Sequence, residues 1–205
     1  MLPLVKRVLL SARNVERLRR LGAELESDGV QVEFATDLRQ LSQGADIVIC
    51  AASLASPSLL LDRIAPDTLV CDAGYPKNLA CHAPGAEMPG ATVFFGGLGQ
   101  ITGRMRFTPD FRGVLNRHPF PDVAHGCLLE GMALALEGRF EPFSQGRGFI
   151  TPERVEAMET IAARHGICLA PLYNADGPVE DGHVCQMAGV LAAGSLLTAL
   201  QTRSS

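Results

Sequence analysis

The chain has 205 residues, of which 47% are hydrophobic and 20% are charged, and its formal net charge is −4. This length fits one large domain or two small ones that share a core, and the composition excludes an intrinsically disordered chain. The acidic balance, the 5% aromatic content and the absence of runs of like charge argue against a nucleic-acid-binding surface.

The first half of the chain alternates apolar runs with helical patterns. Five runs predict short strands, mostly buried and parallel, at Val5–Ala12, Val30–Ala35, Asp46–Ala52, Thr68–Cys71 and Thr92–Phe95. Helices are predicted between them at Val15–Ser27, Asp37–Gln43 and Pro57–Ile64. This alternation predicts an α/β fold with a mainly parallel sheet. The glycines of Gly96-Gly97-Leu98-Gly99 indicate a turn.

From residue 122 the pattern becomes helical. A helix is predicted over Val123–Gly138 with Asp122 as its cap, which places Cys127 about one turn inside the helix and His125 off the thiol's face. Thr151-Pro152 opens a second helix that runs to His165 and stops at Gly166. A third, Ala188–Gln201, is rich in small residues, and we expect it to pack against another helix of this chain or of a second subunit.

The cysteines and the N-terminus indicate the compartment. The six cysteines form no C-x-x-C pair and the histidines show no ligand spacing, so we expect no metal site. Cys50, Cys71 and Cys168 lie in apolar runs, which predicts buried side chains. The N-terminus lacks the apolar length of a signal peptide, and no stretch reaches the ~20 apolar residues of a spanning helix. A cytoplasmic protein without a membrane span is predicted.

A glycine-rich turn normally follows the first strand of a doubly wound nucleotide-binding sheet. No such turn follows Val5–Ala12. We therefore predict a truncated Rossmann-like sheet that starts at the second strand and comprises strands two to six. The end of that second strand distinguishes NAD from NADP. Arg13 there, with Arg17 one turn later, has the charge and reach to bind a 2′-phosphate, which predicts NADPH. Two solvated surface arginines are the alternative. Ser11 and Asn14 belong to the same turn.

The absent first strand would be central in the strand order 3-2-1-4-5-6. We expect either direct pairing of Val5–Ala12 with Asp46–Ala52, or another chain in the empty place, because open edges of apolar strands favour aggregation. In both cases the isolated chain should bind NADPH weakly, since the phosphate-binding turn is missing.

Six segments resemble the long-chain acyl-acyl carrier protein reductase family, in the same order and spacing. They are VLLSARNVERLRRLGAEL, ADIVICAAS, DAGYPKNL, GCLLEGMALALE, FSQGRGFIT and the helix ending in RHG. The family reduces fatty acyl thioesters to aldehydes with NADPH and is akin to NADP domains of the shikimate dehydrogenase and glutamyl-tRNA reductase type. The resemblance implies NADPH as cofactor and acyl carrier protein or acyl-CoA as thioester donor.

The family also carries a substrate-binding portion and a glycine-rich βα unit upstream, and this chain shows neither. We therefore expect a fragment, a truncated reading frame or a diverged relative. The parts would be a partial NADP-binding domain over residues 1–121 and a helical catalytic segment over residues 122–205. A dehydrogenase of small amino or keto acids, and a non-catalytic remnant or assembly module, are the alternative functions.

Cys127 is the expected nucleophile, because a thiolate can take the acyl group from a thioester before hydride attack. The resemblance implies that the family's acylated cysteine lies at this position. The usual burial of cysteine side chains, taken alone, would instead favour a structural cysteine in the core. Glu130, three residues on, shares its helix face and aligns with a family glutamate.

Further candidates follow the predicted strands, where open α/β sheets bind their ligands. Lys77 would stabilise an oxyanion and Tyr75 would donate a proton, although a proline-containing turn with a solvated lysine is the alternative. Small residues would let the cofactor approach: Ala51, Ala52, Ser53 and Gly74. The polar segment 144–147 receives no role from its charge or spacing.

Overall fold

The computed structural model describes residues 5–35, 44–52, 64–66, 68–74, 92–106, 120, 122–144, 150–174 and 176–179. The helices predicted over 37–43, 57–64 and 188–201 lie wholly or almost wholly outside these residues. The chain forms two compact units, one of Met1–Phe94 with Asn174–Ser205 and the other of Phe95–Tyr173. The predicted division into a partial NADP-binding domain over residues 1–121 and a helical segment over residues 122–205 stays a prediction.

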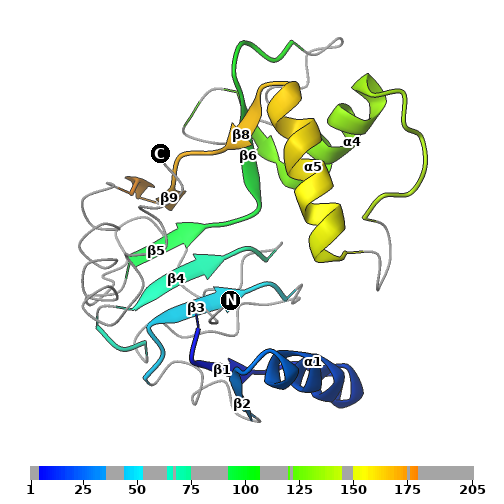
Figure 1. Cartoon of the computed structure of the whole chain (residues 1–205). Coiled ribbons are helices and arrows are strands. Elements are labelled where there is room, and N and C mark those ends of the chain that lie inside the picture. Colours follow the sequence, from blue (N-terminus) through cyan, green and yellow to red (C-terminus); the bar gives the residue numbers. More distant parts are fainter. Residues whose placement is uncertain are drawn as a thin grey trace, which may run out of the picture. The chain divides into compact units, whose positions relative to one another are not determined.

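The first unit opens with a parallel strand–helix–strand element (Figure 1). Strand β1 (Arg7–Leu10) pairs with β2 (Gln31–Phe34), and helix α1 (Val15–Ser27) connects them. All three elements were predicted, and the helix has the predicted ends. Gly22 lets α1 lie close to β2, because a Cβ at this position would come within 2.6 Å of the Phe34 ring.

A three-stranded sheet follows in the first unit. It consists of β3 (Ile47–Cys50), β4 (Leu69–Asp72) and β5 (Thr92–Phe95) in that order, and the arrows of all three run the same way in Figure 1. One face carries the core, where Val48, Ile64, Val70 and Val93 pack together. The three strands were predicted and confirm an α/β fold.

Strands β1 and β3 belong to separate sheets: in the described residues β1 pairs with β2, and β3 pairs with β4. The expected direct pairing of Val5–Ala12 with Asp46–Ala52 is therefore wrong for this part of the chain. Each of the two strands has its ladder partner in its own sheet.

The second unit contains an antiparallel sheet and two helices. Strand β6 (Leu98–Ile101) lies between β7 (Val123–His125) and β8 (Ile167–Leu169), and the helices are α4 (Gly126–Leu136) and α5 (Pro152–Arg164). The chain then forms a short pair of β9 (Tyr173–Asn174) and β10 (Gly177–Pro178). No helix in the described ranges is long and apolar enough to cross a membrane.

The helix predicted from Val123 is wrong over its first three residues. Val123 and Ala124 are almost fully buried and pair with β6, so the helix starts only at Gly126, with His125 as its N-cap. Asp122 is not the cap: it has a left-handed backbone (φ 60°) and accepts a hydrogen bond of 2.8 Å from the Met105 N–H.

The turn predicted over residues 96–99 is also partly wrong, because Leu98 and Gly99 belong to β6. Gly99 is needed inside this strand, since a Cβ there would come within 2.6 Å of Leu129 Cδ1 on α4. The prediction for α5 is confirmed: Thr151 caps the helix by accepting from the Arg154 N–H, and Pro152 opens it.

Two clusters join α4 to its neighbours. Ala133 and Leu134 of α4 pack with Phe143 and with Ile161 of α5. Leu129 packs with Met105 and Ala124. The sheet and α5 therefore hold α4 along much of its length.

Candidate functional site

In the first unit, candidates gather at the carboxyl ends of β3 and β4. Because these strands are parallel and adjacent, Ala51 and Ala52 after β3 and Gly74 after β4 lie at the same edge of the sheet. Ala51 and Ala52 are exposed, and Gly74 is buried. Ser53, Tyr75 and Lys77 lie outside the described residues, and their roles stay predictions.

Asp72 is an acidic residue of this edge that the sequence interpretation missed. It ends β4, it is fully buried, and its Oδ1 accepts a hydrogen bond of 3.2 Å from the Gly74 N–H. This contact shapes the turn that leads toward residue 75. Burial, together with the nearby charge of Asp72, raises the pKa of the Cys50 thiol to about 11. The sequence signal that could have indicated this residue was an acidic side chain at the end of an apolar strand.

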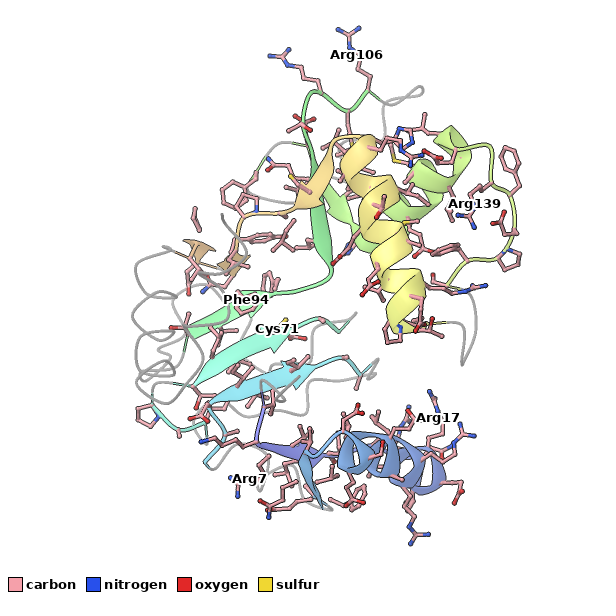
Figure 2. All side chains as sticks on the ribbon, in the orientation of Figure 1. Arg7, Arg17, Cys71, Phe94, Arg106 and Arg139 are labelled. Carbon is pink, nitrogen blue, oxygen red and sulfur yellow. The ribbon has the colours of Figure 1, made fainter. Side chains whose placement is uncertain are left out.

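The residues predicted to select NADPH surround the start of α1. Ser11, Arg13, Asn14 and Arg17 are all exposed, and Figure 2 shows Arg17 projecting from the helix. Asn14 is the N-cap, and its side chain accepts a hydrogen bond of 3.0 Å from the Arg17 N–H. Two guanidinium groups beside a helix N-terminus are a donor set that fits a phosphate.

In the second unit, Cys127 is exposed and is the second residue of α4. The expectation of a position one turn inside the helix is wrong, because β7 occupies the three residues before Gly126. His125 accordingly precedes the helix rather than lying on another of its faces. A negative charge is favoured at a helix N-terminus, where thiolates are commonly stabilised.

A glycine turn fixes the start of α4. The Gly126 N–H donates a hydrogen bond of 2.8 Å to the carbonyl of Gly97, whose left-handed backbone (φ 76°) favours glycine. The first turn of α4, which carries Cys127, is thus tied to the turn before β6.

Glu130 lies three residues after Cys127 on α4 and is held by a residue without a predicted role. Ser144 Oγ donates a hydrogen bond of 2.6 Å to Glu130 Oε1. Residues at this spacing share a helix face, so Ser144 fixes a carboxylate on the face of the thiol.

Ser144 is itself anchored by its neighbour. Phe143 is buried, and its ring lies 4.9 Å from the Arg139 guanidinium and 5.2 Å from that of Arg154. Arg154 also donates a hydrogen bond to the Phe143 carbonyl. Cation–π contacts and this hydrogen bond restrict the segment that carries Ser144.

Cys168 differs from its prediction. It is exposed on β8 rather than buried, and its thiol donates to the Gln100 carbonyl at 3.5 Å. The described residues therefore contain two exposed thiols, of which only Cys127 stands at the start of a helix. No group of three His, Cys, Asp or Glu side chains suited to a metal ion occurs in the described part of the chain.

The fold and these residues define an α/β protein with an exposed cysteine at a helix N-terminus. No family profile matches the chain. It is 32% identical over 167 residues to the long-chain acyl-[acyl-carrier-protein] reductase of Synechococcus elongatus, a match that covers 78% of this chain and 44% of that protein. The similarity supports a distant relationship, and the chain spans less than half the length of this relative. That the chain is truncated stays a prediction.

Proposed function

We propose that this chain carries the catalytic cysteine of an NADPH-dependent reductase that converts fatty acyl thioesters to aldehydes. The donor would be acyl carrier protein or acyl-CoA. The observation that carries the proposal is the exposed Cys127 at the start of α4, in a chain related to an acyl-[acyl-carrier-protein] reductase.

The first step would be acyl transfer to Cys127. Its thiolate attacks the thioester carbonyl, a new carbon–sulfur bond forms, and the bond to the carrier sulfur breaks. The carrier leaves as a thiolate and takes a proton from solvent.

Glu130 would accept the thiol proton, directly or through water, because it lies on the same helix face. The hydrogen bond from Ser144 holds the carboxylate in one orientation, which reduces the entropy lost when the reacting groups align.

The cofactor would be held in the first unit. Arg13 and Arg17 would bind the 2′-phosphate, with Ser11 and Asn14 beside them, and the small residues 51–53 and Gly74 would allow close approach. When bound, NADPH would supply the hydride that reduces the thioester. Lys77 would stabilise the negative charge on the carbonyl oxygen and Tyr75 would donate a proton.

The test is acylation of the purified chain by palmitoyl-CoA or by palmitoyl-acyl carrier protein, followed by intact-mass and peptide mass spectrometry. We expect one hydroxylamine-sensitive acyl group, on Cys127. Cys127→Ala should lose it, and Cys168→Ala, which removes the other exposed thiol, should keep it. Faster labelling by one donor identifies the carrier. Acylation that persists in Cys127→Ala would exclude Cys127 as the nucleophile.

A further inference from the structure

A series of contacts leads from the first turn of α5 to the carboxylate that lies three residues after Cys127 on α4. Arg154 of α5 donates a hydrogen bond from its guanidinium to the carbonyl of Phe143. The next residue, Ser144, donates from its hydroxyl to Glu130 Oε1 at 2.6 Å. One peptide unit therefore separates the group that Arg154 holds from the group that holds Glu130.

Phe143 is held at its ring and at its main chain by the same arginine. Its side chain is buried and packs in one cluster with residues of α4 and α5. The Arg154 guanidinium lies 5.2 Å from the centre of this ring and also bonds to the carbonyl. The peptide unit between Phe143 and Ser144 therefore has little freedom to rotate, and its orientation determines where the Ser144 side chain starts.

A second arginine provides a contrast. Arg139, labelled in Figure 2, lies 4.9 Å from the same ring. Its side chain, however, bonds to Glu141 Oε1 at 2.7 Å, and loss of this side chain would leave the bond from Arg154 to the Phe143 carbonyl in place. The two arginines therefore separate the packing on the Phe143 ring from the control of the main chain beside Ser144.

The orientation of Glu130 matters for its proposed role. A general base must lie within hydrogen-bond reach of the proton it takes, or one water molecule away. A glutamate side chain occupies many rotamers unless a partner selects one of them. Ser144 supplies that partner, so freeing the main chain of Phe143 should lower the fraction of molecules in which the Glu130 carboxylate can take the thiol proton.

We propose that Arg154 is a positioning residue for the acylation of Cys127. Its bond to the carbonyl of Phe143 holds Ser144 in place, and Ser144 in turn holds the Glu130 carboxylate. The inference rests on the proposed function, because it needs Glu130 as the acceptor of the thiol proton. It makes the first turn of α5 part of the machinery of a cysteine on α4.

The test measures how fast the 205-residue chain forms acyl-Cys127 at increasing palmitoyl-CoA, by quenched mass spectrometry. Arg154→Met keeps the aliphatic stem and removes the donor. Its maximum rate should fall by about three- to tenfold, the worth of one hydrogen bond. The half-saturating concentration of palmitoyl-CoA should stay within about twofold, because Arg154 acts on the chemical step rather than on binding. Arg154→Lys, which keeps a donor, should react faster than Arg154→Met.

Three controls locate the effect. Arg139→Gln, the matched variant on the same ring, should keep its maximum rate within about twofold of the parent. In the Glu130→Gln background, Arg154→Met should have no further effect, because both changes interrupt the same series of contacts. The ¹³C resonance of the Glu130 carboxyl, identified by its loss in Glu130→Gln, should shift in Arg154→Met and in Ser144→Ala but not in Arg139→Gln. Circular dichroism identifies the folded variants, and Arg154→Gln is the second variant without the cation.

The outcomes distinguish this inference from the proposed function. A parent chain that forms no acyl-Cys127, or a Glu130→Gln variant that reacts as fast as the parent, would refute the proposed function and this inference with it. A parent that is acylated with the help of Glu130, while Arg154→Met reacts like the parent, would refute the inference alone. So would a loss in Arg154→Met that persists in full in the Glu130→Gln background, since Arg154 would then act on the fold rather than on the carboxylate.

Discussion

A methyl group added at Gly99 tests whether the sheet of the second unit and α4 are packed as tightly as the structure shows. The backbone of Gly99 is not left-handed, so alanine meets no conformational barrier there. Its Cβ, however, would come within 2.6 Å of Leu129 Cδ1 and 3.2 Å of the Cys168 carbonyl. Leu129 is 2% exposed and has little room to move.

The magnitude follows from two opposing effects. Overpacking a core costs about 1–3 kcal/mol, whereas replacing glycine by alanine stabilises by roughly 0.5–1 kcal/mol through the unfolded chain. Gly99→Ala should therefore lower the free energy of unfolding by about 0–2.5 kcal/mol, the difference of the two effects. In a unit of this size each 1 kcal/mol corresponds to roughly 4–8 °C in Tm.

Urea and thermal unfolding, followed by circular dichroism, measure the effect. Gly131→Ala is the matched control, because it lies inside α4 with no atom within 4 Å of the new Cβ. It should stabilise by about 0.5–1 kcal/mol, so Gly99→Ala should be less stable than Gly131→Ala by the cost of the clash, about 1–3 kcal/mol. Leu129→Ala should also cost less in the Gly99→Ala background than alone. A Gly99→Ala protein that gains as much stability as Gly131→Ala would refute the packing described for Leu129.

Three further predictions concern single side chains. The hydrogen bond with His165 lowers the pKa of Glu137 below its usual 4.5. The ionised carboxylate therefore stabilises the folded chain above pH 4.5, and this contribution is lost as the pH falls through the lowered pKa. In Glu137→Gln, the urea midpoint should depend less on pH across this range. Asp122→Ala keeps the left-handed backbone and loses the bond from Met105, which should cost about 1–3 kcal/mol in urea unfolding, whereas Asp122→Asn should cost little. Iodoacetamide should label Cys50 more slowly than the two exposed thiols, with a rate that rises until about pH 11, as peptide mass spectrometry would measure.

The elements that could be predicted are those whose signals are local. Strands β1 to β5 are apolar runs between turn residues, and α1 and α5 carry their own caps at Asn14 and Thr151. The start of α4 could not be predicted in this way. Val123–His125 continues the composition of the helix, and only its pairing with β6, more than twenty residues earlier in the sequence, makes it a strand.

The candidate site divides in the same manner. Cys127 and Glu130 were predicted from a resemblance and from helical spacing. The contact between Ser144 and Glu130 joins residues fourteen positions apart, so no periodic pattern indicates it. Gly99 was predicted to be a turn residue. The structure instead needs glycine there because Leu129, on another element, fills the space of a side chain.

The direct passage from β7 into α4 limits which length changes the protein tolerates. His125 pairs with Leu98 and also occupies the N-cap position of the helix, so the thiol lies a fixed two residues beyond the sheet. Extra residues between β6 and β7 would lengthen only the connection between the two strands. The pairing of His125 with Leu98, and with it the position of Cys127, would not change. A single residue inserted between His125 and Cys127 would instead turn the thiol by about 100° around the helix axis. Functional homologues should therefore vary in length before β7 and not between β7 and the cysteine.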